Sequence, residues 1–170
     1  MADRDRSLVS RMADGDEKAF EELYNLYARK VYAYLRSRNT DEQTANDILQ
    51  DTFLAAWRSC GRFQGGSEVL TWIIGIARHK LADAVRARER ARAAPLEDEH
   101  AVPDTSAQTV ERLTLHEALA GLDEEHRELL HMVFVLGMSY AEAAKVLEVP
   151  EGTVKSRMFT LKRQLAGQLA

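Results

Sequence analysis

Two short stretches of the sequence are rich in basic side chains, which can bind the phosphate groups of nucleic acids. Residues 78–92 contain six Lys or Arg and two acidic residues, and residues 150–170 contain four and one. Lysine and arginine side chains both form charge-assisted hydrogen bonds with phosphate oxygens, and arginine also recognises the edges of bases. These stretches are therefore candidate nucleic-acid interfaces, with a plain solvated helix face as the alternative.

The net charge of the whole chain points the other way. The 170 residues include 23 Lys and Arg and 27 Asp and Glu, which gives a net charge of −4. That total alone argues against nucleic-acid binding. However, residues 93–110 hold four acidic residues and no Lys or Arg, and residues 111–149 hold eight acidic and three basic residues. These acidic segments offset the basic ones in the total, so the net charge is a poor guide to the binding partner.

The sequence lacks the residue sets that several other protein classes need. The single cysteine, Cys60, excludes an internal disulfide, and Cys60 with His79 gives too few ligands for a structural zinc site. The sequence shows no paired carboxylates, no nucleophile–base arrangement and no phosphate loop, so we do not expect an enzyme. It also indicates no metal or other cofactor. No apolar run approaches the ~20 residues that span a bilayer, and residues 1–6 lack a signal-peptide core. We therefore expect a cytoplasmic protein without stable membrane insertion.

The apolar residues recur at helical spacing and no strand pattern is found, which predicts an all-α protein. A first helix over residues 19–34 follows the start signal at residues 14–16 (DGD) and stops at Asn39. A second helix opens with an expected capping box at residues 40–43 (TDEQ). After a glycine-rich loop, a long helix runs from about residue 69 to residue 90.

A break in composition divides the chain into two small helical domains. Residues 93–108 contain two of the three prolines, no Lys or Arg, and no apolar periodicity. Such a segment predicts a flexible linker. The expected domains are therefore residues 1–92 and residues 109–170.

The second domain has the layout of a helix-turn-helix. Predicted helices cover about residues 109–120 and 123–137, the latter with a capping aspartate and a terminal glycine. A capping box at residues 139–142 (SYAE) opens the third helix, and a last helix runs over residues 151–168. The inward positions that we expect on the third helix are Ala141, Ala144, Val146 and Leu147.

The last helix separates apolar from polar side chains, as a DNA-recognition helix does. Its apolar positions are Val154, Met158, Leu161 and Leu165. The opposite face and its flanks carry Lys155, Ser156, Arg157, Phe159, Thr160, Lys162 and Arg163. An exposed Phe159 suits contact with a thymine methyl group or a sugar. The alternative is a three-helix packing module whose last helix is simply solvated.

Two stripes in the first domain also suggest binding surfaces. On the second helix, the face opposite the core carries Asp47, Gln50, Asp51, Leu54 and Arg58. An apolar leucine within an acidic stripe is typical of a protein docking site. On the long helix, one face carries Trp72, His79, Asp83, Arg86 and Arg90, a combination that suits the bases and phosphates of an opened DNA strand. For each stripe the alternative is an ordinary amphipathic helix, with the tryptophan buried.

Five motifs together resemble a known family. Residues 15–24 (GDEKAFEELY), 47–57 (DILQDTFLAAW) and 71–78 (TWIIGIAR) look like the promoter-opening domain of bacterial extracytoplasmic-function (ECF) sigma factors of the sigma-70 family. Residues 137–144 (GMSYAEAA) and 150–157 (PEGTVKSR) look like their promoter-reading helix-turn-helix. The resemblance covers nearly the whole chain except the expected linker.

This resemblance implies a sigma factor that binds core RNA polymerase, recognises two promoter elements and initiates transcription. The residues implied in docking on the largest polymerase subunit are Asp47, Gln50, Asp51 and Leu54. Those implied at the minus-ten element are Phe63, Trp72, Arg78, His79, Lys80, Arg86 and Arg88. Those implied at the minus-thirty-five element are Thr153, Lys155, Ser156, Arg157, Phe159 and Arg163. The resemblance also implies an anti-sigma factor as a partner.

Two other functions remain open from the sequence. A conventional helix-turn-helix regulator with an N-terminal sensing or interaction domain accounts for residues 109–170 but leaves both stripes of the first domain unexplained. A helical adaptor that binds only proteins is the other alternative. In that case, replacement of Arg157 and Arg163 leaves the activity unchanged.

Overall fold

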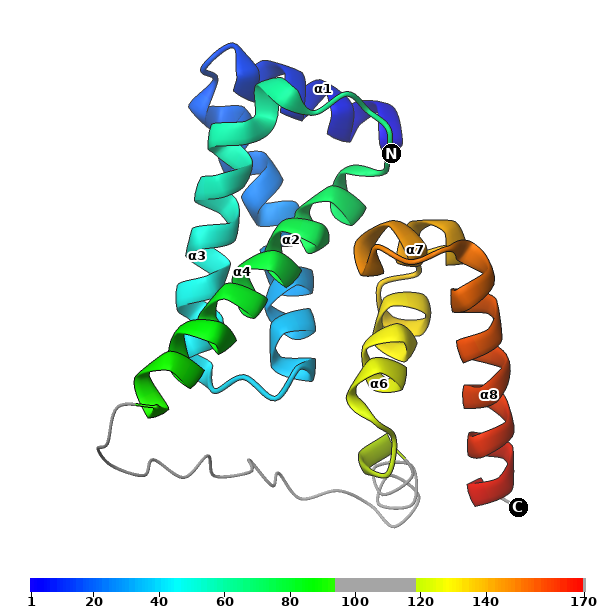
Figure 1. Ribbon diagram of the computed structural model, residues 1–170. Helices are drawn as coiled ribbons and strands as arrows, with labels where there is room; N and C mark the ends of the chain where they lie inside the picture. Colours follow the sequence, from blue (N-terminus) through cyan, green and yellow to red (C-terminus); the bar gives the residue numbers. More distant parts are fainter. Residues whose placement is uncertain (94–118, 170) are drawn as a thin grey trace.

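A computed structural model describes residues 1–93 and 119–169 of the chain (Figure 1). Within these ranges the regular structure is helical and no β-strand occurs, which confirms the all-α prediction. Apart from Ala93, the expected linker at 93–108 lies outside the described residues. The expected helix at 109–120 also lies outside them, except for its last two residues, which are helical.

Four helices form the N-terminal unit. They are α1 (Ala2–Ala13), α2 (Glu17–Ser37), α3 (Glu42–Ser59) and α4 (Val69–Arg92), with the 3-10 turn η1 (Cys60–Arg62) after α3. Helix α1 is an element that the sequence analysis did not predict. Its apolar side chains Leu8, Val9 and Met12 have helical spacing and are all buried. The sequence therefore carried a helical pattern here, but a short one.

Local capping interactions set the helix starts in this unit. Gly15, with a φ of +87°, makes the turn after α1, a conformation that glycine adopts without strain. Asp16 then caps α2 by accepting hydrogen bonds from the backbone amides of Lys18 and Ala19. The expected capping box at Thr40 is wrong by one residue. Asp41 caps α3 instead, while the Thr40 hydroxyl donates to the carbonyl of Leu35.

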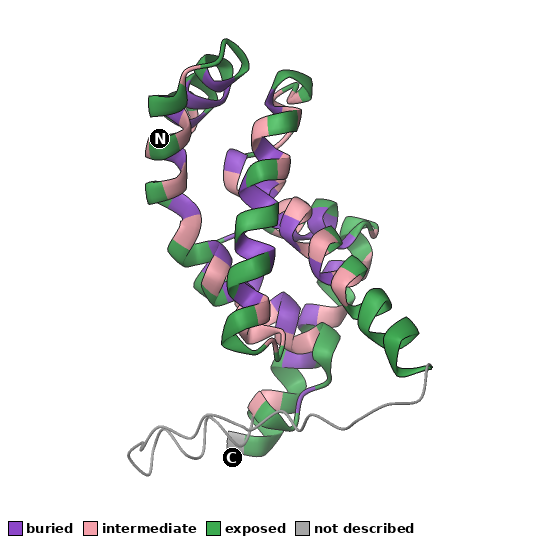
Figure 2. Cartoon of the chain, turned by 90° about the vertical axis from the view of Figure 1, so that its left-hand side faces the viewer, coloured by how far each residue is buried: buried purple, intermediate pink, exposed green. Residues whose placement is uncertain are grey.

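The core of the N-terminal unit is formed by the apolar faces of its four helices. Its most deeply buried large side chains are Leu8, Met12, Leu23, Tyr34, Leu35, Phe53, Ile73 and Ile74. The exposed positions lie on the outer faces, and the end of α4 from Val85 onward is exposed on all sides (Figure 2). The basic residues of that end are therefore accessible to a large ligand.

The C-terminal unit contains α6 (Glu124–Leu130), the π-helical turn η2 (His131–Val135), α7 (Tyr140–Leu147) and α8 (Glu151–Leu169). Asp123 caps α6, and the capping box of Ser139 and Glu142 on α7 is confirmed. On α8, Val154, Met158 and Leu161 are buried as expected and Leu165 is half-buried. One expected inward position on α7 is wrong, because Ala141 is exposed and Ala143 is buried.

The two units pack against each other. Helix α7 lies beside α4, and α6 approaches the end of α2 (Figure 1). Helix α8 lies on the far side of the C-terminal unit from α4. This arrangement leaves the outer face of α8 open while it brings α7 close to the basic helix α4.

Candidate functional site

The acidic stripe on α3 is exposed along its length. Asp47, Gln50 and Asp51 are exposed, and Leu54 keeps 48% of its surface accessible. On the opposite side of the helix, Phe53 is buried in the core. Helix α3 therefore presents an apolar side chain within an acidic surface, the pattern expected of a protein docking site.

Trp72 on α4 is neither fully buried nor fully exposed. Its ring is half-buried and lies 4.9 Å from the Phe63 ring, centroid to centroid. Both rings line a cavity of about 480 Å³, together with His79 from the next turns of α4. The structure thus brings three minus-ten candidates together around one hollow, where a base could stack on an aromatic surface.

Two minus-ten candidates are engaged by the C-terminal unit. The Nε of Arg78 donates to Oε1 of Glu128 at 3.1 Å, and Nε2 of His79 lies 3.0 Å from Oε1 of Glu148. In this conformation, therefore, each side chain already has a carboxylate partner in the C-terminal unit. Their expected role in DNA binding stays a prediction.

Three arginine candidates on α4 form a separate group. Arg78, Arg86 and Arg88 line a second cavity of about 640 Å³, together with Arg38, the residue that follows α2. Arg86 is paired with Asp83. The sequence candidates on α4 are therefore divided between an aromatic hollow and an arginine-lined one.

Asp41 holds Arg88 near the start of α3. The Arg88 Nη2 lies 3.4 Å from Asp41 and 3.1 Å from the Thr44 hydroxyl. Hydrogen bonds from the side chain and backbone of Thr44, with help from Arg88, lower the pKa of Asp41 to about 2. Lys80 is half-buried and lines neither of the two cavities.

The outer face of α8 carries most of the minus-thirty-five candidates. Phe159 keeps 64% of its surface exposed, and the Arg163 guanidinium lies 5.8 Å from its ring centre, within the range of a cation–π contact. Lys155 and Ser156 are also exposed, whereas Thr153 is half-buried. Arg157 differs from the expectation, since it is half-buried and pairs with Glu125 of α6 at 3.2 Å.

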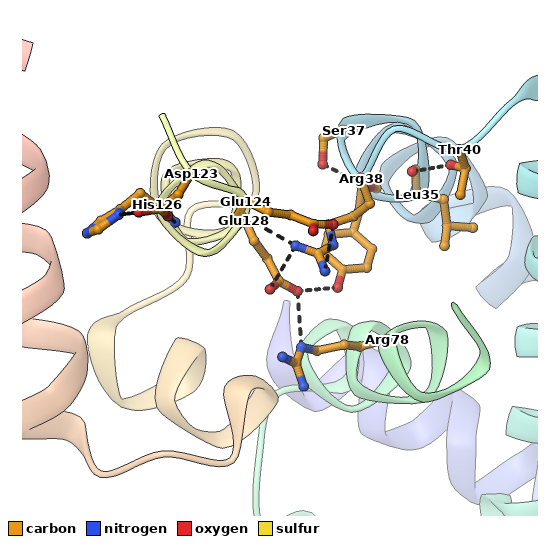
Figure 3. A network of polar contacts seen from close by, with 10 residues as sticks. Leu35, Ser37, Arg38, Thr40, Arg78, Asp123, Glu124, His126 and Glu128 are labelled. Carbon is orange, nitrogen blue, oxygen red and sulfur yellow. Dashed lines mark hydrogen bonds and ion pairs between the residues drawn. The ribbon is translucent and has the colours of Figure 1, made fainter. Parts of the chain in front are cut away.

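One functional candidate was missed by the sequence analysis. Glu128 on α6 is only 2% exposed and joins Arg38 and Arg78 in a polar network (Figure 3). Tyr34 also donates to its carboxylate, and burial together with that nearby charge raises the pKa of Tyr34. The available signal was an acidic residue next to Leu129 on the apolar face of a helix.

Cys60 packs as a core residue of the N-terminal unit. Cys60 is buried, and its thiol donates to the carbonyl of Trp57 at 2.9 Å, as a small core residue would. Within residues 1–93 and 119–168, no group of three or more His, Cys, Asp or Glu is placed to hold a metal ion. Among the helices of the described ranges, none is long and apolar enough to cross a membrane.

Comparison with family models gives two matches. Residues 23–91 match Sigma-70 region 2, and residues 112–165 match Sigma-70 region 4. The first match includes the α3 stripe and the α4 candidates, and the second includes the whole of the α6–α8 core. A conventional helix-turn-helix regulator does not account for the region 2 match.

Individual relatives agree with the family models. The ECF RNA polymerase sigma factor SigM of Mycobacterium tuberculosis is 33% identical over 162 residues, which cover 95% of this chain and 83% of SigM. Among solved structures, CnrH in complex with the cytosolic domain of CnrY has a TM-score of 0.72 and 28% identity, covering 98% of this chain and 97% of CnrH. The sigma factor RpoE of Bartonella quintana, in complex with the anti-sigma factor NepR, has a TM-score of 0.71 and 25% identity, covering 89% and 97%. The chain therefore belongs to the ECF RNA polymerase sigma factors of the sigma-70 family.

Proposed function

We propose that this chain binds core RNA polymerase, directs it to promoters and helps to open them. The α3 stripe docks on the polymerase, the α4 candidates hold the minus-ten strand, and α8 reads the minus-thirty-five element. The domains are residues 1–92 and 109–170, joined by a linker at 93–108. The chain acts by binding and carries out no catalytic step. Because polymerase and promoters are in the bacterial cytoplasm, the chain works there.

The outer face of α8 is the observation that carries this proposal. Helix α8 buries Val154, Met158 and Leu161, while it leaves Phe159 and the adjacent Arg163 accessible. An accessible large aromatic next to an arginine is unfavourable as plain surface but suits the major groove, where arginine reads guanine and apolar atoms meet thymine. Lys155 and Ser156 provide phosphate contacts beside it.

The α3 stripe supports polymerase docking in a different way. Leu54 is exposed between acidic neighbours, so a partner with a small apolar pocket and basic rim would fit it. The anionic side chains of Asp47 and Asp51 also disfavour direct contact with DNA. The α3 surface is therefore assigned to protein binding and the α4 and α8 surfaces to DNA.

An anti-sigma factor is a further expected partner. Two structural relatives, CnrH and RpoE, were solved with CnrY and NepR, and the latter is named as an anti-sigma factor. We propose that a protein of this kind binds the present chain and competes with core polymerase. Recovery of polymerase alone in a pull-down from source cells would argue against such a partner.

Run-off transcription on a promoter library tests the main proposal. With core polymerase, the wild-type chain should give transcripts from a defined set of promoters, while neither component alone should do so. Leu54→Ala should weaken core binding by about tenfold, a typical loss for an exposed apolar anchor at an interface. Leu26→Ala is the matched control, because Leu26 is also partly exposed but lies on α2, away from the stripe.

Two results would contradict the proposal. One is the absence of promoter-specific transcripts when the folded chain is added to core polymerase. The other is tight, specific binding of the isolated chain to promoter duplex in a gel-shift assay, since a sigma factor is expected to need polymerase for this step.

A further inference from the structure

Phe159 and Arg163 contact each other on the outer face of α8. Phe159 keeps 64% of its surface exposed, and the Arg163 guanidinium lies 5.8 Å from its ring centre. Side chains four positions apart share one face of a helix, and helical side chains lean toward the N-terminus of their helix. Arg163 therefore reaches back over the ring of Phe159, and the contact follows from ordinary helix geometry.

The cations on α8 differ in what holds them. Nζ of Lys155 lies 3.0 Å from a glutamate carboxylate on the same helix, and Nη2 of Arg157 lies 3.2 Å from a glutamate of α6. Within residues 1–93 and 119–168, no carboxylate lies within ion-pair distance of Lys162 or Arg163, and of these two only Arg163 contacts an aromatic ring. Arg163 is thus the cation on α8 that is held by a ring instead of a carboxylate.

The backbone beneath this pair is anchored by the core of the C-terminal unit. Met158 and Leu161 lie on either side of Phe159 in the sequence, and both are buried. The ring is therefore attached to a rigid support. An arginine side chain loses much rotamer freedom when it binds a ligand, and this loss weakens binding. Contact with a rigidly supported ring restricts the rotamers of Arg163 before DNA arrives.

Recognition of guanine benefits from such a restriction. Arginine recognises guanine through two hydrogen bonds, to O6 and N7 in the major groove, and both depend on the orientation of the planar guanidinium. A cation–π contact engages the charge and the face of the guanidinium and leaves its N–H donors available. Arg163 also borders a hollow of about 280 Å³ together with Thr160 and Gln164, which are both exposed. A base edge can therefore approach the guanidinium from outside.

We propose that Phe159 is a positioning residue for Arg163, and that the pair gives α8 its preference for one guanine of the minus-thirty-five element. The ring holds the guanidinium in the orientation that makes both hydrogen bonds to guanine. The preference therefore requires an aromatic side chain at position 159 as well as the arginine. This inference rests on the proposed function, and it assigns the recognition of one base to one pair of side chains.

Base-analogue substitution in the promoter tests the guanine contact. The probe is a labelled promoter duplex selected by run-off transcription, in which each guanine of the minus-thirty-five element is replaced in turn by 7-deazaguanine. This analogue lacks the N7 acceptor but keeps O6. For the complex of wild type with core polymerase, one replacement should weaken binding by about tenfold. We call this ratio the guanine penalty, and Arg163→Ala should reduce it to about onefold.

Two substitutions of Phe159 separate positioning from simple apolar contact. Phe159→Leu keeps an apolar side chain that can contact a thymine methyl group but removes the ring, so the guanine penalty should fall to about threefold or less. Phe159→Tyr restores the ring and should restore a penalty of about tenfold. If Phe159 serves only to contact thymine, Phe159→Leu keeps the full penalty, and that result would overturn the inference. The absence of a penalty at every guanine for wild type would overturn it as well.

Phe134→Leu is the matched control. Phe134 is also an exposed phenylalanine of the C-terminal unit, with 63% of its surface accessible, but it belongs to η2 and not to α8. The same substitution there should leave the guanine penalty at the wild-type value. The penalty compares two templates with a single protein preparation, so a change in the folded fraction of a variant does not alter it.

The two proposals fail in distinguishable ways. If wild type directs run-off transcription but Phe159→Leu keeps the full guanine penalty, the positioning role of Phe159 is wrong and the proposed function stands. If wild type directs no run-off transcription, the proposed function itself is wrong.

Discussion

The two candidate DNA-binding faces differ in which part of the chain contacts them. On α8, the polar contacts recorded for the described side chains stay within the C-terminal unit, and Phe159 and Arg163 face solvent. On α4, Arg78 and His79 are contacted by glutamates of the other unit. The α8 face is therefore available in the free chain, whereas two of the α4 candidates already have carboxylate partners in the other unit.

This difference shows two ways in which a helix surface is determined. The amphipathic pattern of α8 decides which residues are buried and which are free, because its core lies within its own unit. For Arg78 and His79 on α4, side chains of the other unit also determine how accessible the surface is. We therefore expect changes on α8 to act directly on promoter reading, and changes around Glu128 to act through the packing of the two units.

The largest effect is expected when the scaffold of only one face is weakened. Met158 is almost fully buried beneath α8, and Met158→Ala should cost about 2–5 kcal/mol of unfolding free energy through lost packing and a new cavity. Both tryptophans, Trp57 and Trp72, are in the N-terminal unit, so fluorescence reports that unit while circular dichroism reports all helices. The denaturation midpoint measured by circular dichroism should therefore fall much more than the midpoint measured by fluorescence. Equal shifts of the two midpoints would indicate that the two units unfold as one cooperative body. The control is Gln168→Ala, since Gln168 is exposed.

The next effect concerns the α8 face alone. Arg163→Ala should weaken promoter binding by the polymerase complex by about 1–3 kcal/mol, the usual value of a good arginine contact with a base. The loss should appear only on promoters with an intact minus-thirty-five element, measured by filter binding or run-off titration. An equal loss on templates without that element would show that Arg163 supports folding or polymerase binding instead.

A smaller effect should separate the α4 face from the α8 face. Tyr34→Phe removes the hydrogen bond to Glu128 but keeps the aromatic ring, which weakens the contact between the units by about 0.5–1.5 kcal/mol. The free chain should then bind a single-stranded minus-ten oligonucleotide more tightly, with no change in polymerase-dependent reading by α8. Tyr27→Phe is the matched control, because the Tyr27 hydroxyl donates to Asp5 within the N-terminal unit. A similar gain for both variants would contradict the special role of the contact with Glu128.

The smallest effect is a pH dependence in the C-terminal unit. Burial lowers the pKa of His131 below its usual 6.5, and its Nε2 is buried without a hydrogen-bond partner. The unfolded chain therefore binds the proton more readily. The stability that neutral His131 contributes to the folded chain is fully present above pH 6.5. It declines as the pH falls, by at most about 1.4 kcal/mol per pH unit. Denaturation at pH 7, 6 and 5 should show a smaller decline for His131→Phe than for wild type, and identical slopes would refute this assignment.

The sequence predicts the local features of the fold well. Helix periodicity, the Asp123 cap and the capping box at Ser139 depend on residues within one turn of each other, and each is confirmed. The error at Thr40 also has a local cause, because two neighbouring residues could both cap α3 and the aspartate does so. Helix α1 was missed because its apolar pattern is brief and follows a charged start.

The site is predictable only where its own helix decides exposure. The α3 stripe and Phe159 are exposed as the helical pattern predicts. The pattern does not reveal that Arg157 turns toward Glu125, or that Arg78 meets a glutamate 50 residues later in the chain. Such contacts depend on how separate elements pack, and helical periodicity carries no information about this.

The distance between the two units in the free and bound chain tests the central claim most directly. Spin labels at Glu21 on α2 and Gln168 on α8, in a Cys60→Ala background, should give one narrow distance distribution in the free chain. Addition of core polymerase and promoter should replace it with a longer distance as Arg78 and His79 exchange their carboxylate partners for DNA. A broad distribution in the free chain, or an unchanged distance in the complex, would contradict the account.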